Sequence, residues 1–174
     1  MQIIQLARDR YAGKPLNYSF DSTSRLFVRE EKAEGMPAFF LEKHPADRLH
    51  ITFVTCLYPK QVSDATAFGL VDNEGRLSGV IQLCPRESGF LHVMDLLVFE
   101  GYRRRGYGSL LLSKGKAQAR YLGCRGLTLR LSSENTGAYA FLTRQGMRMT
   151  GFNLSCKRAE ETNPRFLIDM GCEV

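Results

Sequence analysis

The chain has no tryptophan, few prolines and no long hydrophobic run. Its 174 residues include six prolines, and no stretch approaches the roughly 18 apolar residues of a membrane span. The N-terminal segment MQIIQLAR lacks a basic stretch that leads into an apolar run of signal-peptide length. We therefore expect a cytoplasmic protein with no membrane partner.

Cysteine and histidine are sparse and unsuitably spaced for a metal site. The five cysteines are an odd number without a C-x-x-C pair, and the three histidines show no H-x-x-x-H or H-E-x-x-H spacing. These absences argue against a disulfide framework, a zinc site and a Cys–His nucleophile. We expect reduced cysteines and no metal.

Composition is that of a soluble globular protein, and the net charge alone does not select a partner. Hydrophobic residues make up 44% and charged residues 24%, ordinary values for one globular domain over residues 1–174. The net charge of +6 is compatible with nucleic acid, an acidic surface or a polyphosphate cofactor. The densest basic run, Arg103 to Arg105, stands between glycines and lacks interleaved aromatic residues, so we favour a compact phosphate pocket and expect no nucleic-acid partner.

The N-terminal third has short, conflicting periodicities. Strand-like stretches occur at Gln2 to Leu6, Ser24 to Val28 and Ile51 to Tyr58, with a possible helix around Glu30 to Leu41. The pattern is clearer from Ala65 onward. Two strands, Thr66 to Val71 and Leu77 to Cys84, are joined by a tight turn at Asp72 to Gly75.

A strand-helix-strand unit follows. Phe90 to Phe99 is almost continuously apolar, which predicts a central strand covered on both faces and makes Asp95 conspicuous. A helix after Gly108 would bury Leu111, Leu112, Ala119 and Leu122, and Leu127 to Ser132 alternates as a half-buried strand. This order implies a parallel, right-handed crossover. A helix capped by Ser133 or Asn135 and running to Gln145, and strands at Arg148 to Ser155 and Phe166 to Met170, complete a mixed α/β sheet.

The loop between Val98 and Ser109 carries the most chemical information. It leaves a buried strand, contains Arg103-Arg104-Arg105-Gly106-Tyr107-Gly108, and opens a helix. Glycines let several N–H groups point into one concavity, and the helix start adds about half a positive charge. The loop is either an anion site or a solvated basic turn with a helix cap.

This segment resembles motif A of the GNAT superfamily of N-acetyltransferases, Q/R-x-x-G-x-G/A after a strand that ends in Val. The matching residues are Arg103, Gly106 and Gly108 behind Val98. Downstream, Asn135, Ala138 and Gly146 stand where members of the superfamily carry N-x-x-A and a helix-ending Gly.

A weaker resemblance points to the streptothricin acetyltransferase branch of that superfamily. It rests on Phe27 to Glu30 and Gly151 to Leu154, followed by Glu160 and Glu161. The branch's aromatic-rich terminal strand is absent, because Phe166 to Met170 contains a single aromatic residue. The acceptor therefore need not be streptothricin.

The resemblance implies a GNAT-like domain with a mixed α/β (α+β) sheet of six to seven strands, splayed at its two central parallel strands. Its acetyl-CoA-binding core would span about residues 65–155. Pantetheine would bond unpaired backbone groups near Val98, and the pyrophosphate would lie on the N–H groups from Arg104 to Ser109. The implied cofactor-binding residues are Leu97, Val98, Phe99, Arg103, Arg104, Arg105, Gly106, Tyr107, Gly108, Ser109 and Asn135. A plain helix cap is an equal interpretation of Asn135.

Acetyl transfer to an amine needs a base and a proton for the thiolate. Asp95 is our candidate base, since burial would raise its pKa, although a hydrogen-bonded strand Asp is an equal interpretation. His92 is a second base candidate. Many members of the superfamily carry a Tyr seven residues after the helix-start Asn, but Leu142 stands there. Tyr139 is the nearby substitute acid, or a packed aromatic residue.

We therefore expect an acetyl-CoA-dependent N-acetyltransferase whose acceptor is a primary amine of a small molecule or peptide, attacked directly in a ternary complex. The alternative is a non-catalytic acyl-CoA-binding regulatory module. Glu30, Glu31 and Glu34 either line a site for a cationic substrate or form a charged surface. An exposed late strand makes a homodimer possible.

Overall fold

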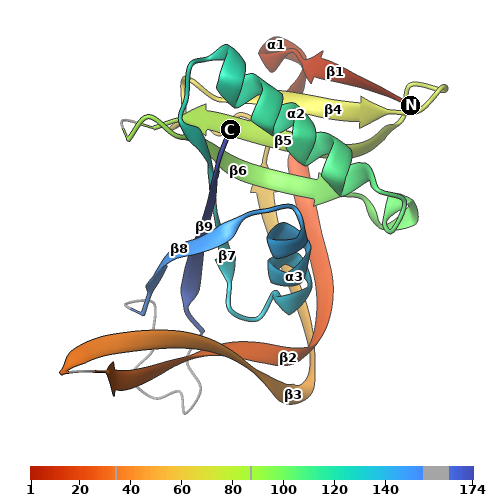
Figure 1. The fold of residues 1–174 in the computed structure, drawn as a ribbon. Helices are drawn as coiled ribbons and strands as arrows, with labels where there is room; N and C mark the ends of the chain where they lie inside the picture. The colour runs from red at the N-terminus through yellow and green to blue at the C-terminus, as the bar shows by residue number, and fades with distance from the viewer. Residues whose placement is uncertain (34, 87, 155–164) are drawn as a thin grey trace. The chain divides into compact units, whose positions relative to one another are not determined.

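The computed structural model describes residues 1–33, 35–86, 88–154 and 165–174. Among these residues, seven strands form one mixed sheet in the order β1-β4-β5-β6-β7-β9-β8, and β2 pairs with β3 in a two-stranded sheet (Figure 1). The expectation of a mixed sheet of six to seven strands with helices is confirmed.

The elements follow one another along the chain as strands interrupted by three α-helices and one 3-10 helix in the described residues. They are β1 (Gln2–Leu6), α1 (Arg8–Tyr11), β2 (Pro15–Ala33), β3 (Met36–Cys56), β4 (Thr66–Val71), β5 (Leu77–Pro85), β6 (Leu91–Val98), η1 (Glu100–Tyr102), α2 (Tyr107–Tyr121), β7 (Gly126–Ser132), α3 (Thr136–Arg144), β8 (Arg148–Asn153) and β9 (Leu167–Glu173).

The chain divides into two compact units. The first unit comprises Met1–Tyr18, Phe53–Leu129 and Gly171–Val174, and the second comprises Ser19–Thr52 and Arg130–Met170. The first unit therefore contains the predicted hairpin, the central strand and the basic loop. The second contains α3 and most of the β2–β3 ribbon.

In the first unit, α2 covers the antiparallel strands β4, β5 and β6 (Figure 1). Leu111, Leu112 and Ala119 are buried on this face, as their spacing predicts. Leu122 was expected to join them, but it lies beyond the last helical turn and is 46% exposed, so that prediction is wrong. At Gly115, an added Cβ would lie 2.9 Å from Ile81 Cδ1, which explains why the smallest residue stands where the helix meets β5.

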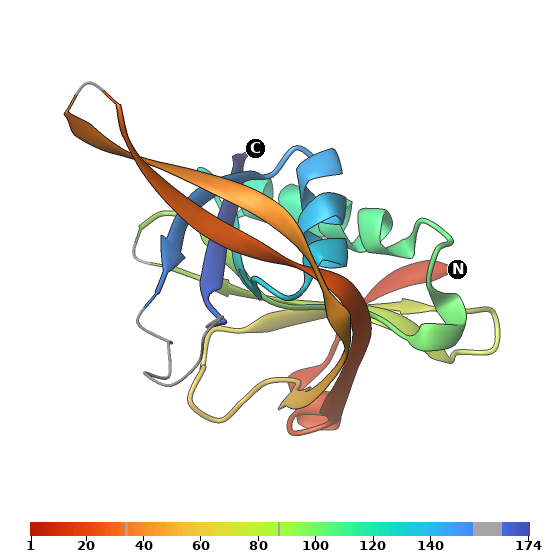
Figure 2. The same cartoon turned by 90° about the horizontal axis from the view of Figure 1, so that it is seen from below.

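The predicted helix at Glu30 to Leu41 is also wrong. Residues 30–33 belong to β2 and residues 36–41 to β3, and Figure 2 shows these two strands as one long twisted ribbon. Most β3 residues are exposed or half-buried. When few side chains of a segment are buried, its apolar residues need not recur with the two-residue period of a strand or the 3.6-residue period of a helix. The spacing of apolar residues then does not distinguish a strand from a helix.

In the second unit, α3 begins at its N-cap Asn135 and packs beside the ribbon. Leu26 donates its N–H to the Ser133 carbonyl at 2.9 Å, and the Thr136 hydroxyl lies within 3.1 Å of the hydroxyls of Ser22 and Ser24. These buried contacts fix the start of α3 against β2. Ser155, the expected end of β8, lies outside the described residues.

Candidate functional site

The loop between η1 and α2 has the backbone of an anion-binding nest. Arg104 and Gly106 have left-handed φ angles of 63° and 81°. Among the residues that the structure describes, none accepts a hydrogen bond from the backbone N–H groups of Arg104, Arg105, Gly106, Tyr107 or Gly108. Successive N–H groups in such a turn converge on one point and attract an anion.

Both ends of this loop are held by the chain itself. On the strand side, Arg103 donates its N–H to the Glu100 carbonyl at 3.2 Å and its Nε to the Val98 carbonyl at 3.1 Å. On the helix side, Ser109 donates its N–H to the Gly106 carbonyl at 3.0 Å. The free N–H groups thus end at Gly108, one residue earlier than expected.

The backbone near Val98 is also less open than expected. The Val98 carbonyl already accepts from Arg103, and the Phe99 N–H donates to the Ser78 carbonyl at 3.0 Å. A carbonyl oxygen has two lone pairs, so Val98 retains one acceptor position for a further donor. Two of the backbone groups at this strand end are therefore occupied by the chain itself.

The pairing of β6 changes at the level of Asp95. On one side, β5 pairs Gln82 with Asp95 and Leu83 with Val93, so Met94 is the extra residue of a β-bulge. On the other side, the parallel register with β7 covers Leu91, His92 and Val93. Among the described residues, β6 therefore continues from Met94 to Val98 beyond its last registered pair with β7.

Asp95 is the centre of a buried polar cluster in the first unit. Its side chain is only 6% exposed. Its Oδ1 accepts hydrogen bonds from the Thr55 hydroxyl at 2.7 Å and the Tyr18 hydroxyl at 3.1 Å. Its Oδ2 accepts from Gln82 Nε2 at 2.8 Å. Both carboxylate oxygens are thus satisfied within the unit.

Burial and hydrogen bonding act on Asp95 in opposite directions. Desolvation raises the pKa of Asp95, the three donors lower it, and the net pKa lies above its usual range. Burial also raises the pKa of the Tyr18 phenol, and the neighbouring Asp95 charge raises it further. Tyr18 therefore remains a hydroxyl donor at neutral pH, while Asp95 becomes a stronger base than an exposed carboxylate.

The second unit holds the other two predicted site residues, Asn135 and Tyr139. Asn135 Oδ1 accepts from the Ala138 N–H at 3.0 Å, which confirms the helix-cap interpretation and leaves its side-chain amide without an acceptor among the described residues. Tyr139 lines a groove of about 370 Å³ together with Leu26, Leu41, Lys43, Thr136, Ala140 and Thr143. Leu142 is 3% exposed and belongs to the core.

Sequence reasoning found Asp95 but missed the residues that hold it. Tyr18, Thr55 and Gln82 come from three strands and lie 77, 40 and 13 residues from Asp95. The one local signal was Gln82, a polar residue within the apolar run of β5. Gln82 pairs with Asp95 because of the β-bulge at Met94, and no sequence pattern predicted that bulge.

Three of the glutamates named above fall in parts of the chain that the structure does not describe. Glu34, Glu160 and Glu161 lie outside the described residues. Among the residues that are described, no three His, Cys, Asp or Glu side chains group as metal ligands. No helix in those parts of the chain is long and apolar enough to cross a membrane.

Solved structures share this fold over nearly the whole chain. A putative streptothricin acetyltransferase from Bacillus anthracis, solved in complex with acetyl coenzyme A, has a TM-score of 0.74 and 19% identity, with 99% of each chain covered. A nourseothricin acetyltransferase has the same TM-score and identity, with 99% of this chain and 97% of the other covered. These likenesses confirm the GNAT-like fold.

Sequence comparison adds a curated relative and a family model. Chloroplastic GCN5-related N-acetyltransferase 4 of Arabidopsis thaliana is 35% identical over 63 residues, which are 36% of this chain and 22% of that protein. The chain thus matches less than a quarter of that relative's length. The model of the acetyltransferase (GNAT) family matches residues 25–147, well over half of the chain. The chain therefore belongs to the GNAT family of acetyltransferases.

Proposed function

We propose that this chain is an acetyl-CoA-dependent N-acetyltransferase that acetylates a primary amine of a small molecule or peptide by direct attack in a ternary complex. The observation that carries the proposal is the run of five N–H groups from Arg104 to Gly108, at the start of α2, that have no acceptor in the described part of the chain. The exposed side chains of Arg104 and Arg105 add positive charge around it. This arrangement suits a diphosphate.

The residues proposed to hold acetyl-CoA come from the end of β6 and the basic loop in the first unit, and from Asn135 in the second. The N–H groups of Arg104 to Gly108 would bind the pyrophosphate, and the remaining acceptor position of Val98 would bind a pantetheine amide. The free side-chain amide of Asn135 would donate to the cofactor arm. The acetyl-CoA complex of the B. anthracis protein supports this ligand. We place the acetyl-CoA-binding core at about residues 65–155 of one functional domain.

Bound acetyl-CoA supplies an activated acetyl thioester. Asp95, with its raised pKa, is the proposed base and takes the proton that the acceptor nitrogen loses as its bond to the acetyl carbon forms. Because Oδ1 lies behind the hydroxyls of Thr55 and Tyr18, the proton would pass through one of them. Tyr139 is the proposed donor to the sulfur as the carbon–sulfur bond breaks, since its hydroxyl has no partner among the described residues.

A cationic amine is the acceptor that the first unit favours. The rings of Tyr18 and Phe53 stack with centroids 4.5 Å apart beside the Asp95 carboxylate, and Phe53 is 45% exposed. Aromatic faces and a carboxylate both attract a protonated amine. On the ribbon, Arg29 forms ion pairs with Glu31 and Glu42, which favours the charged-surface interpretation of the ribbon glutamates.

Calorimetry and thermal unfolding with acetyl-CoA test the proposal. Ligand at about 100 times its Kd stabilises a protein by about 2.7 kcal/mol. Absence of any shift at millimolar acetyl-CoA would refute cofactor binding. Binding without transfer to any member of a broad amine panel would instead identify the non-catalytic acyl-CoA-binding module, which the burial of Leu142 at the family's acid position favours.

A further inference from the structure

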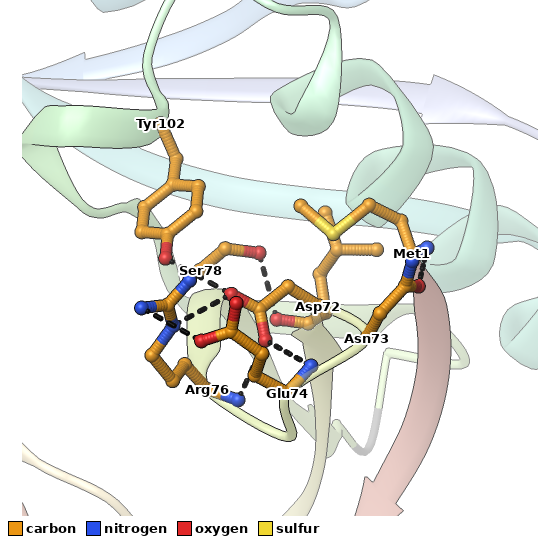
Figure 3. Close-up of polar contacts among 8 residues, drawn as sticks. Met1, Asp72, Asn73, Glu74, Arg76, Ser78 and Tyr102 are labelled. Atoms are coloured by element: carbon orange, nitrogen blue, oxygen red, sulfur yellow. Dashed lines mark hydrogen bonds and ion pairs between the residues drawn. The ribbon is translucent and has the colours of Figure 1, made fainter.

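Tyr102 links the basic loop to a distant hairpin. It is the last residue of η1 and stands two positions before Arg104, the first residue with a free N–H group. Its backbone N–H donates to the Phe99 carbonyl at 2.9 Å. Its hydroxyl donates to Asp72 Oδ2 at 3.3 Å, across 30 residues of sequence. Figure 3 shows the phenol directed at the turn between β4 and β5.

Asp72 is rigidly oriented to receive this hydroxyl. Its Oδ1 accepts from the backbone N–H groups of Glu74 and Arg76, each at 2.9 Å, and its Oδ2 accepts from Arg76 Nε at 2.9 Å (Figure 3). These donors lower the pKa of Asp72 from 3.8 to about 2, with the backbone N–H of Arg76 contributing most. The group is therefore an anion at neutral pH, and a hydrogen bond to it is charge-assisted.

The free N–H groups need such a support from outside the loop. The first turn of α2 orients the N–H groups of Tyr107 and Gly108. Those of Arg104, Arg105 and Gly106 precede the helix and donate to no described residue, so no hydrogen bond of their own fixes the direction in which they point. Arg103 ties the loop to the end of β6, and Ser109 ties it to the first turn of α2. The Tyr102 hydroxyl adds a third attachment, to the β4–β5 turn, from η1, an element that contains no buried residue.

We propose that Tyr102 is a positioning residue, whose hydrogen bond to Asp72 holds the N–H groups of Arg104 to Gly108 in the orientation that binds the cofactor pyrophosphate. This inference rests on the proposed function. It assigns the β4–β5 turn, which contacts no reacting atom, a part in cofactor affinity. The phenol acts through the loop and touches no ligand.

Tyr102→Phe removes the hydroxyl and keeps the ring. We expect the Kd for acetyl-CoA and the Kd for inorganic pyrophosphate to rise about three- to tenfold, since a single hydrogen bond of this kind is lost. In steady-state assays, KM for acetyl-CoA should rise while kcat stays within about twofold, because the acetyl group and the base are untouched. Calorimetry and initial rates measure both effects.

Two matched controls separate the hydroxyl from general effects of mutation. Tyr121→Phe makes the same change at a phenol that is 83% exposed at the end of α2. Glu74→Gln alters the same turn by weakening an ion pair with Arg76 Nη1 at 3.0 Å, and leaves the Tyr102 contact in place. Both should bind acetyl-CoA and pyrophosphate as the unmodified protein does.

A measurement without ligand keeps this inference separate from the proposed function. Backbone ¹⁵N relaxation should show lower order parameters for residues 104–108 in Tyr102→Phe, and unchanged ones in both controls. Unchanged order parameters, or lower ones with unchanged affinity for pyrophosphate, would overturn the positioning role. If the unmodified protein binds no acetyl-CoA, the proposed function fails, and the relaxation and pyrophosphate data still decide whether Tyr102 orders the loop.

Discussion

Two polar regions of the first unit differ in how their hydrogen-bonding groups are satisfied. The loop from Arg104 to Gly108 presents five N–H groups without a partner among the described residues. Asp95, in the strand that leads to it, has both carboxylate oxygens occupied by three donors of the same chain. Exposed, unpartnered donors are inexpensive in water, whereas an unpartnered buried carboxylate would be strongly destabilising.

This difference shows which region can be interpreted from its own geometry. The exposed N–H groups of the loop are free to bind an anion, which is the role that we propose for them. Asp95 is complete as it stands, and its three donors suit a structural role as well as a catalytic one. The raised pKa of Asp95, caused by burial, is what makes it a base candidate, and the following experiments separate these roles.

The largest expected effect belongs to Asp95→Asn. If Asp95 is the base, kcat/KM for acetyl transfer should fall about 10²- to 10⁴-fold, and the limb of the pH-rate profile set by its raised pKa should disappear. The unfolding free energy should also fall by about 1–3 kcal/mol, because the new amide would face Gln82 Nε2, another donor.

Initial rates across pH and urea unfolding measure these two consequences. The exposed Asp64→Asn serves as the matched control and should leave both unchanged. Loss of stability with an unaltered pH-rate profile and kcat/KM would show that Asp95 is purely structural.

Tyr139→Phe is expected to have the second largest effect. Loss of a general acid should lower kcat by up to about 10²-fold, the lower end of such effects, since a thiolate is a good leaving group. The Kd for acetyl-CoA should not change. Stopped-flow or steady-state assays measure kcat, with Tyr121→Phe as the control. An unchanged kcat would mean that solvent protonates the sulfur.

Gly106→Ala tests the loop and should have a smaller effect. The added methyl group meets no atom within 4 Å, so the penalty comes only from the left-handed backbone at φ 81°. That penalty is about 1–2 kcal/mol, equivalent to roughly 5- to 30-fold weaker acetyl-CoA binding if the loop must distort. Gly101→Ala, with equal space and no left-handed φ, should bind normally in calorimetry.

The smallest effect concerns the pH dependence of stability. The lowered pKa of Asp72 stabilises the fold above its unfolded value near 3.8, and this contribution is lost as the pH falls toward 2. The raised pKa of Asp95 has the opposite effect. Its contribution to the free energy of unfolding decreases as the pH rises above 3.8. Asp72→Asn should therefore flatten the acid side of the Tm-against-pH curve. An equally steep acid limb would argue against this assignment.

Local pattern predicted the elements that bury many apolar residues. The β4–β5 hairpin, the central strand β6 and helix α2 were found because alternation, apolar runs and glycines specify them locally. The β2–β3 ribbon was missed at Glu30 to Leu41, since strands of such a ribbon pair with each other while most of β3 lies exposed or half-buried.

The sequence by itself determined the basic glycine loop, its place after a buried strand and the presence of one carboxylate in that strand. These features depend on neighbouring residues and on backbone angles that glycine permits. Only the tertiary structure decided that Tyr18, Thr55 and Gln82 surround Asp95 and that Asp72 receives Tyr102. Such contacts join residues far apart in the chain, and they depend on strand order, register and a single bulge, which are properties of the folded sheet.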